Sequence, residues 1–210
     1  MEDKYSAKQR LKRKIIIFFV FISMFLLVSY GAMGIFSYFS SRGQDENYQT
    51  TYLFYPSDYE ADIFEDQEYL GLNRYITVVN GPVSTTVVDN DYTAYGDVVV
   101  FLAEKYIASI IAGDAEAYNL CFSEEYYTEN QPMDRFTMQQ LYNISLIFQD
   151  EELKENGEAE YNTYAYRVEY MIHRNNGTFR RDMDSDSIRA QYLIISDREG
   201  ELKIDRIVTP

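Results

Sequence analysis

Residues 164–173 read YAYRVEYMIH, and this stretch decides the fold that the sequence predicts. Large apolar side chains occupy every second position: Tyr164, Tyr166, Val168, Tyr170 and Ile172. The positions between them carry Ala165, Arg167, Glu169, Met171 and His173. A period of two is typical of a β-strand with one face against a core. The stretch therefore predicts a long strand that buries an aromatic face.

Turn signals divide the second half of the chain into four runs, residues 144–154, 161–174, 178–196 and 201–208. The signals are the pairs Asn156-Gly157, Asn176-Gly177 and Glu199-Gly200. Strands that follow one another through short turns pair with their neighbours in sequence. The second half therefore predicts an antiparallel meander.

Helical signals precede the meander. A segment that opens at Asp97 and closes at Gly113 places one apolar side chain set on a single helical face: Val99, Leu102, Ala103, Tyr106, Ile107 and Ile110. Asp114 can cap a short second helix that runs through Cys121, and Ser123 a single turn after it. Pro132 and Asp134 predict the start of a third helix that ends near Tyr142.

Two further elements are expected before residue 92. Residues 73–79 and 83–88 are rich in β-branched side chains and flank Asn80-Gly81-Pro82, which predicts a hairpin. Ser57 and Glu60 have the spacing of a capping box, so an acidic helix is predicted from there to Gly71. Disorder of this acidic segment is the alternative.

The order of these elements resembles a known family. Residues 99–127 hold a long helix ending in Ala112-Gly113-Asp114, a short helix and the run FSEEY, and residues 200–205 read GELKID. These features resemble the opening and the last strand of NTF2-like (cystatin-like α+β) domains, over about residues 92–208. The resemblance implies an α+β fold with helices packed on a curved antiparallel sheet that holds a pocket. Its members include isomerases and dehydratases, domains of cell-wall enzymes, and membrane-anchored assembly factors of the VirB8-like kind.

An uncharged run precedes the predicted domain. Residues 15–39 read IIIFFVFISMFLLVSYGAMGIFSYF, and a helix of this length spans about 37 Å, enough for a hydrocarbon core of roughly 30 Å. The run is longer than the apolar core of a cleaved signal peptide, which favours an uncleaved signal anchor. Six basic residues lie in the tail 1–14, so the N-terminus is expected in the cytoplasm and the C-terminal domain outside it.

The domain organisation that follows has five parts. A basic tail (1–14) leads into a transmembrane helix (15–39) that contacts the lipid bilayer, and a polar tether (40–56) follows. Residues 57–91 form the acidic helix and hairpin, and residues 92–210 form the NTF2-like α+β domain.

Composition limits the partners. Residues 15–210 carry 13 basic and 32 acidic side chains, a net charge of −19, which repels nucleic acid. Cys121 is the only cysteine, so an internal disulfide is impossible and an apolar core must hold the domain together. Protein subunits or a second copy of the chain are the expected partners.

Candidate chemical groups are few. His173, the only histidine, is predicted to be a solvated residue at a strand end, and Cys121 to be a buried, unreactive thiol. Asp182, Asp184 and Asp186 copy the first ligands of a calcium loop, but Ser187 replaces its glycine. Weak calcium binding is one interpretation; an acidic strand edge that blocks strand addition is the favoured one.

The sequence favours a non-catalytic function. Glu169 and Tyr166 are expected on opposite faces of their strand, so they do not converge into an acid–base pair. We therefore expect no catalytic, cofactor-binding or metal-binding residues and no cofactor. The leading hypothesis is a membrane-anchored protein-interaction or scaffold domain of an envelope or secretion assembly. The alternative is a pocket that binds or transforms a small hydrophobic ligand.

Overall fold

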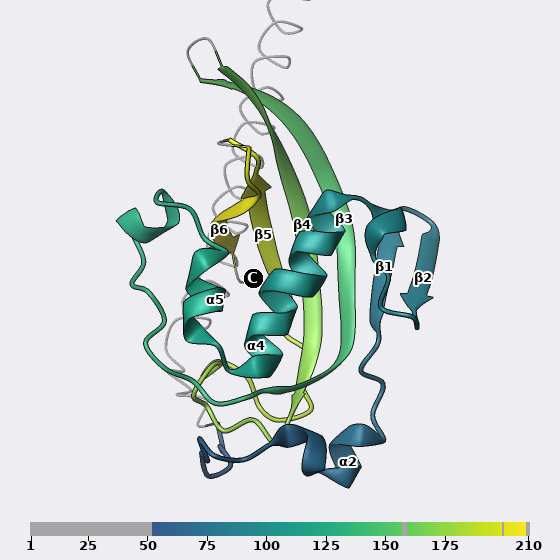
Figure 1. The fold of residues 1–210 in the computed structure, drawn as a ribbon, viewed down its shortest axis with the longest axis vertical. Helices are drawn as coiled ribbons and strands as arrows, with labels where there is room; N and C mark the ends of the chain where they lie inside the picture. Colours follow the sequence, from purple (N-terminus) through teal and green to yellow (C-terminus); the bar gives the residue numbers. More distant parts are fainter. Residues whose placement is uncertain (1–51, 157–158, 199, 209–210) are drawn as a thin grey trace, which may run out of the picture. The chain divides into compact units, whose positions relative to one another are not determined.

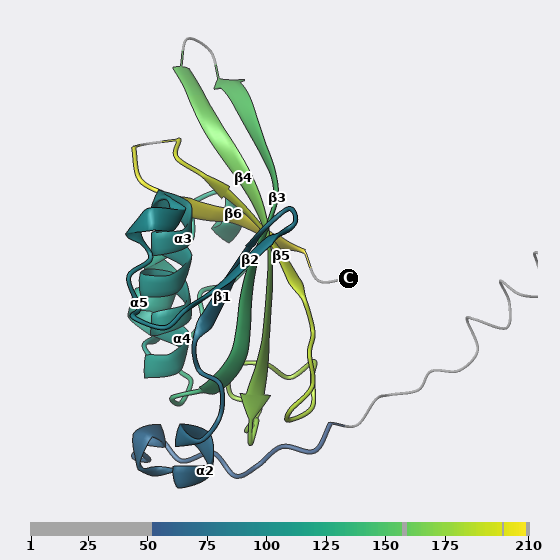
Figure 2. The same cartoon turned by 90° about the vertical axis from the view of Figure 1, so that its right-hand side faces the viewer.

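A curved six-stranded sheet with helices on one face forms the domain (Figures 1 and 2). The computed structural model describes residues 52–156, 159–198 and 200–208. The tail 1–14, the predicted membrane helix 15–39 and most of the tether lie outside these residues. Within the described ranges, no helix has both the length and the apolar character needed to span a bilayer. The fold class is α+β.

The sheet has the order β2-β1-β3-β4-β5-β6. Its strands are β1 (Ile76–Asn80), β2 (Val83–Val87), β3 (Gln140–Asn156), β4 (Ala159–His173), β5 (Gln191–Ser196) and β6 (Lys203–Val208). Strands β3 to β6 pair antiparallel with their neighbours in sequence. The predicted meander is therefore confirmed, and the alternating stretch in β4 lies at its centre.

One predicted strand is half wrong. The run 178–196 was expected to be extended throughout, but only Gln191–Ser196 forms β5, and residues 174–190 form a loop. Asn175 explains the loop, because its buried amide nitrogen donates to the carbonyls of Arg180 (3.0 Å) and Met183 (2.9 Å). A side chain that satisfies buried backbone carbonyls replaces the hydrogen bonds that a sheet ladder would supply.

The predicted hairpin is confirmed, and it belongs to the same sheet. Asn80 pairs with Val83, which leaves Gly81 and Pro82 as a two-residue turn, and Gly81 has the left-handed φ of 56°. Strand β1 then pairs in parallel with β3, from Ile76 opposite Ile144 to Val79 opposite Ile147. Residues 57–91 and 92–208 thus form one compact unit.

The long predicted helix is confirmed as one continuous helix over residues 97–112. It consists of α3 (Asp97–Val100), a π-helical stretch (Phe101–Ile107) and α4 (Ala108–Ala112). Its predicted apolar stripe is buried against the sheet. Gly113 ends the helix with φ of 67°, and Asp114 caps α5 (Ala115–Leu120) by accepting from the amide of Ala117 at 2.9 Å.

The predicted third helix is wrong. Residues 131–139 have no regular secondary structure, and β3 already begins at Gln140. Tertiary contacts outweigh the capping signal here. Phe136 is buried among aromatic rings, and the backbone nitrogen of Gln139 donates to the carbonyl of Ile111 at 3.3 Å. The segment lies so close to Gly113 that a Cβ there would be 2.5 Å from the Met138 nitrogen.

The acidic helix is shorter than predicted and has other caps. A 3-10 turn (Ile63–Glu65) is capped by Asp62, and α2 (Gln67–Leu70) by Asp66 rather than by Ser57. The predicted end at Gly71 is confirmed. We call residues 52–71 the strap, because the buried Tyr69 ring and its hydroxyl, which donates to the Leu141 carbonyl at 3.1 Å, fasten it to β3.

Candidate functional site

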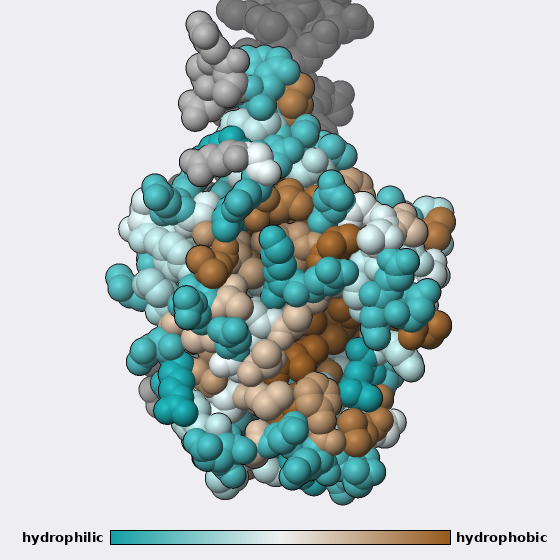
Figure 3. Space-filling model, viewed as in Figure 1, coloured by the Kyte–Doolittle hydropathy of each residue, from teal (hydrophilic) through white to brown (hydrophobic). Residues whose placement is uncertain are grey.

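One candidate site is an open cavity of about 810 Å³ between the start of α3 and the sheet. We call it the mouth pocket. Aromatic side chains form its walls: Tyr95, Phe101, Phe148, Tyr164 and Tyr166. Its charged lining residues are Asp97, Glu151, Asp197, Glu201 and Lys105. Figure 3 shows hydrophobic atoms gathered on this face and bordered by hydrophilic ones.

A β-bulge places Glu151 in the mouth pocket. Phe148 pairs with Tyr166 and Glu151 pairs with Tyr164, with a register shift between Phe148 and Asp150. Paired residues project from the same face of a sheet, and one extra residue in a strand reverses the alternation that follows. Without the bulge, Asp150 would share the face of Phe148, and Glu151 would point away from the pocket.

The turn after β5 closes one side of the mouth pocket. The Asp197 carboxylate accepts hydrogen bonds from the backbone nitrogen (2.7 Å) and the side-chain nitrogen (3.2 Å) of Asn162 on β4. Burial, followed by the negative charges of Asp197 and Glu151, raises the pKa of Tyr164. Burial and Glu151 likewise raise the pKa of Tyr166. The two hydroxyls therefore stay neutral in a pocket whose field is negative.

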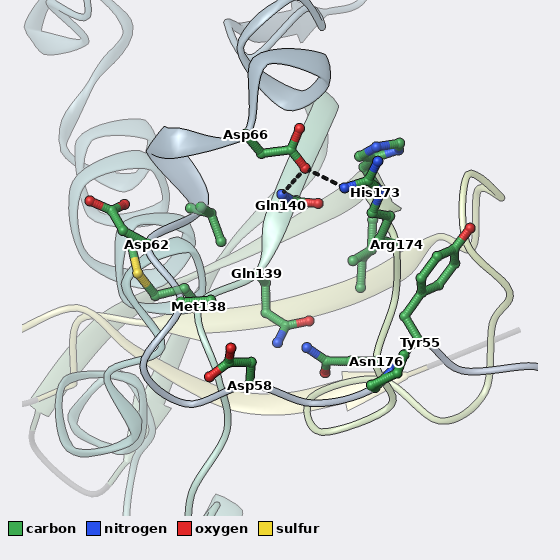
Figure 4. Close-up of a pocket in the computed structure, with 14 residues that line it drawn as sticks. Tyr55, Asp58, Asp62, Asp66, Met138, Gln139, Gln140, His173, Arg174 and Asn176 are labelled. Atoms are coloured by element: carbon green, nitrogen blue, oxygen red, sulfur yellow. Dashed lines mark hydrogen bonds and ion pairs between the residues drawn. The ribbon is translucent and has the colours of Figure 1, made fainter.

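A second, smaller hollow of about 260 Å³ lies under the strap (Figure 4). Asp66 is held there by Gln140 (3.0 Å) and by Arg174 (2.8 Å), and Figure 4 shows both contacts. The hydrogen bond from Gln140 is the main cause that lowers the pKa of Asp66. Asp58 and Gln139 lie at the other end of the hollow. These contacts join strap to sheet, so the hollow is primarily an attachment site.

The prediction for His173 is half right: it is the last residue of β4, but it is largely covered. Its side chain is only 17% exposed, because it lies between the strap and the loop 174–190. Its Nδ1 is 3.2 Å from Asp186 Oδ1, and its Nε2 is 3.8 Å from Glu68 Oε2. The Tyr142 hydroxyl also donates to Asp186, at 2.9 Å. The alternation in β4 did not reveal that the strap and the loop 174–190 cover the strand end.

The acidic strand edge is also wrong, because the three aspartates lie in a loop. Asp182 pairs with Arg180, whose Nε is 2.6 Å away, and with Arg189, whereas Asp186 binds Tyr142 and His173. The carboxylates of Asp182 and Asp186 therefore bind different partners. In the described part of the chain, no three His, Cys, Asp or Glu side chains are arranged to hold a metal ion.

A buried polar network that the sequence did not reveal joins the long helix to the sheet. The hydroxyls of Tyr106 and Tyr170 donate to Gln191 at 3.3 and 3.1 Å, and Arg180 donates to the Tyr170 hydroxyl at 3.0 Å. Arg180 is only 6% exposed, and its bond to Asp182 compensates the charge.

Two predictions about single residues are confirmed. Cys121 is buried, and its burial raises the pKa of the thiol to about 11, so it is a poor nucleophile. Tyr166 is buried in the core, whereas Glu169, three residues later on β4, lies opposite Ser145 and pairs with Arg167, so the two side chains do not converge.

Comparison with protein-family models, curated proteins and solved structures finds no match to this chain.

Proposed function

We propose that the protein is a single-pass membrane protein whose C-terminal domain binds other proteins outside the cytoplasm, without catalysis, in an envelope or secretion assembly. Residues 15–39 anchor it in the bilayer, and the partners are protein subunits or a second copy. The uncharged run and its basic flank support the anchor. A curved sheet with helices on one face supports the NTF2-like resemblance, although a fold alone does not choose a function.

The observation that carries the proposal is a projecting arm formed by residues 153–156 of β3 and 159–162 of β4. Strand β1 pairs with β3 only as far as Ile147, and β5 pairs with β4 only from Thr163 onward. The arm is therefore two-stranded and extends beyond the rest of the sheet (Figures 1 and 2). Leu153 on the arm is 58% exposed.

The base of the arm is fixed to the domain, because Asn162 bonds to Asp197 and the Tyr161 ring contacts Arg198. Beyond this base the arm is a two-stranded ribbon, which is at best marginally stable in water and offers unpaired backbone groups along its edges. A partner that packs on Leu153 or pairs with a free edge supplies what the domain does not. The arm is thus suited to contact another protein.

The arm also lies far from the attachment point. The described chain begins at Tyr52 beside the strap, and the arm is at the opposite end of the domain (Figure 2). The Tyr55 amide, which donates to the Asn175 carbonyl at 2.9 Å, fixes the entry point of the chain.

Site-specific photocrosslinking in intact membranes tests the proposal. A photoreactive amino acid at Leu153 of the full chain is expected to give a covalent adduct with a protein subunit or a second copy. The same amino acid at Leu120, an exposed apolar position on α5, serves as the control. Equal yields of adduct from the two positions, or none from Leu153, would contradict a role for the arm.

The alternative function, binding or transforming a small hydrophobic ligand, is favoured by one observation. The mouth pocket, at about 810 Å³, has the size of typical small-molecule sites, roughly 300–1,000 Å³. Its acidic lining is unusual for a neutral hydrophobic ligand, and this feature leads to a more specific inference.

A further inference from the structure

We infer that the mouth pocket receives a basic side chain, lysine or arginine, from the protein partner. The inference rests on the proposed function, because it names the chemistry of the contact that the partner makes. It depends on three properties of the cavity: its walls, its charge and its position beside the arm.

The walls suit a cation on an apolar stem. Phe101, Phe148 and Leu202 supply apolar surface, while Tyr95 and Tyr164 are partly exposed aromatic rings. Aromatic faces attract ammonium and guanidinium groups, and the methylene stems of lysine and arginine pack on apolar surface. Phe148 and Tyr166 hold each other edge to face, with ring centres 5.6 Å apart, so the back wall is preformed.

The charge of the pocket selects a cation over an anion. Four carboxylates and one ammonium group line the cavity, a net charge of −3. Elsewhere on the domain, carboxylates pair with arginines, as in Arg174 with Asp66 and Arg180 with Asp182. The described residues offer no such ion pair to Asp97 or Glu151. A basic side chain from outside would supply the missing charge.

The position links the pocket to the arm. Phe148 and Glu151 belong to the same strand as Leu153 and lie just before the two-stranded part of β3. A partner that contacts the arm can therefore place a side chain in the pocket from the same segment.

Peptide binding to the full chain in phosphatidylcholine nanodiscs tests the inference. The probe is a fluorescent peptide, acetyl-Ala-Phe-Arg-Phe-Ala, and its control replaces arginine with citrulline, which has nearly the same shape without the charge. Fluorescence anisotropy is expected to show the arginine peptide binding about tenfold more tightly. Equal affinities of the two peptides would overturn the inference.

Substitutions locate the binding. The double variant Asp97→Asn with Glu151→Gln is expected to weaken binding of the arginine peptide by about tenfold. The matched control, Glu116→Gln with Asp134→Asn, removes two exposed carboxylates outside the pocket, one of them also in the first turn of a helix. Thermal unfolding of both variants checks that the fold persists. A control that weakens binding as much as the pocket variant would contradict the assignment.

Two further results separate this inference from the proposed function. Arginine amide that binds as tightly as the peptide would overturn a protein side chain as the source and indicate a free organic cation. Crosslinking from Leu153 reads out the arm independently of pocket charge. An adduct there, combined with equal binding of the arginine and citrulline peptides, would leave the assembly proposal standing and refute the cation site.

Discussion

The strap offers a sharp test of which contacts hold it on the sheet. Two of the contacts that fasten it can be compared directly: the buried ring of Tyr69, and the ion pairs of Arg174 with Asp66 and Glu68. Tyr69→Ala removes the first and Arg174→Ala removes the second. We expect Tyr69→Ala to release the strap and Arg174→Ala to leave it in place.

The magnitudes decide this expectation. Tyr69 is 1% exposed, and truncation of a buried aromatic ring to alanine costs about 3–5 kcal/mol. The Arg174 side chain is 41% exposed and its partner Glu68 70%, and pairs exposed to this degree contribute about 0–1 kcal/mol each. The two pairs together contribute about 0–2 kcal/mol, so the ring outweighs them by about 1–5 kcal/mol.

Hydrogen exchange measured by mass spectrometry on the full chain separates the two variants. The amides of Leu70, Gly71 and Leu72 bond within the strap, and they are expected to exchange rapidly in Tyr69→Ala. In Arg174→Ala their protection is expected to fall by at most about thirtyfold, since the two pairs contribute at most about 2 kcal/mol and 1.4 kcal/mol corresponds to a factor of ten. Greater loss of protection in Arg174→Ala than in Tyr69→Ala would refute the reasoning.

Three other predictions concern the fold and its titration. Gly113→Ala is expected to lower the free energy of unfolding by about 2–5 kcal/mol in urea titrations, because the added Cβ overlaps the Met138 backbone and alanine is strained at a left-handed φ. Gly200 also has a left-handed φ but open space around it, so Gly200→Ala is expected to lower the free energy of unfolding by only about 1–2 kcal/mol. Cys121 is expected to react with a thiol reagent at pH 8 only after denaturation, and rapid labelling of the folded chain would contradict its burial. Burial raises the pKa of Tyr69 to about 12, above its unfolded value of 10.0. The stability that the neutral hydroxyl contributes is therefore complete below pH 10 and is lost as the pH rises to 12. Unfolding monitored by circular dichroism is expected to show that Tyr69→Phe loses less stability than the wild type over this range.

Local patterns predicted the elements whose contacts are local. The alternation in β4, the stripe on the long helix and the turn at Gly81 each follow from neighbouring residues, and all three are present. The failures occur where distant residues decide the conformation. Pro132 and Asp134 are typical of a helix start. The burial of Phe136 and the hydrogen bond from the Gln139 backbone to Ile111 at the end of α4 hold the segment in an irregular conformation instead.

The candidate site was harder to predict than the fold. The mouth pocket collects side chains from β3, β4, the start of α3 and the turn after β5, and no sequence spacing relates them. The bulge at Gln149 adds a further obstacle, because strict alternation assigns Glu151 to the wrong face. His173 shows the same limit, since its two carboxylate neighbours lie far away in sequence.

The parallel pairing of β1 with β3 has a consequence for synthesis on the ribosome. Ile76 leaves the ribosome 68 residues before its partner Ile144, as 144 minus 76 gives. At a synthesis rate of about 5–20 residues per second, roughly 3–14 s pass before the part of β3 that pairs with β1 has been synthesised. During that interval it exposes valine-rich strands that cannot persist as an isolated ribbon. The nascent chain therefore exposes an unpaired hairpin early, and a chaperone that covers residues 76–87 would act before the sheet forms.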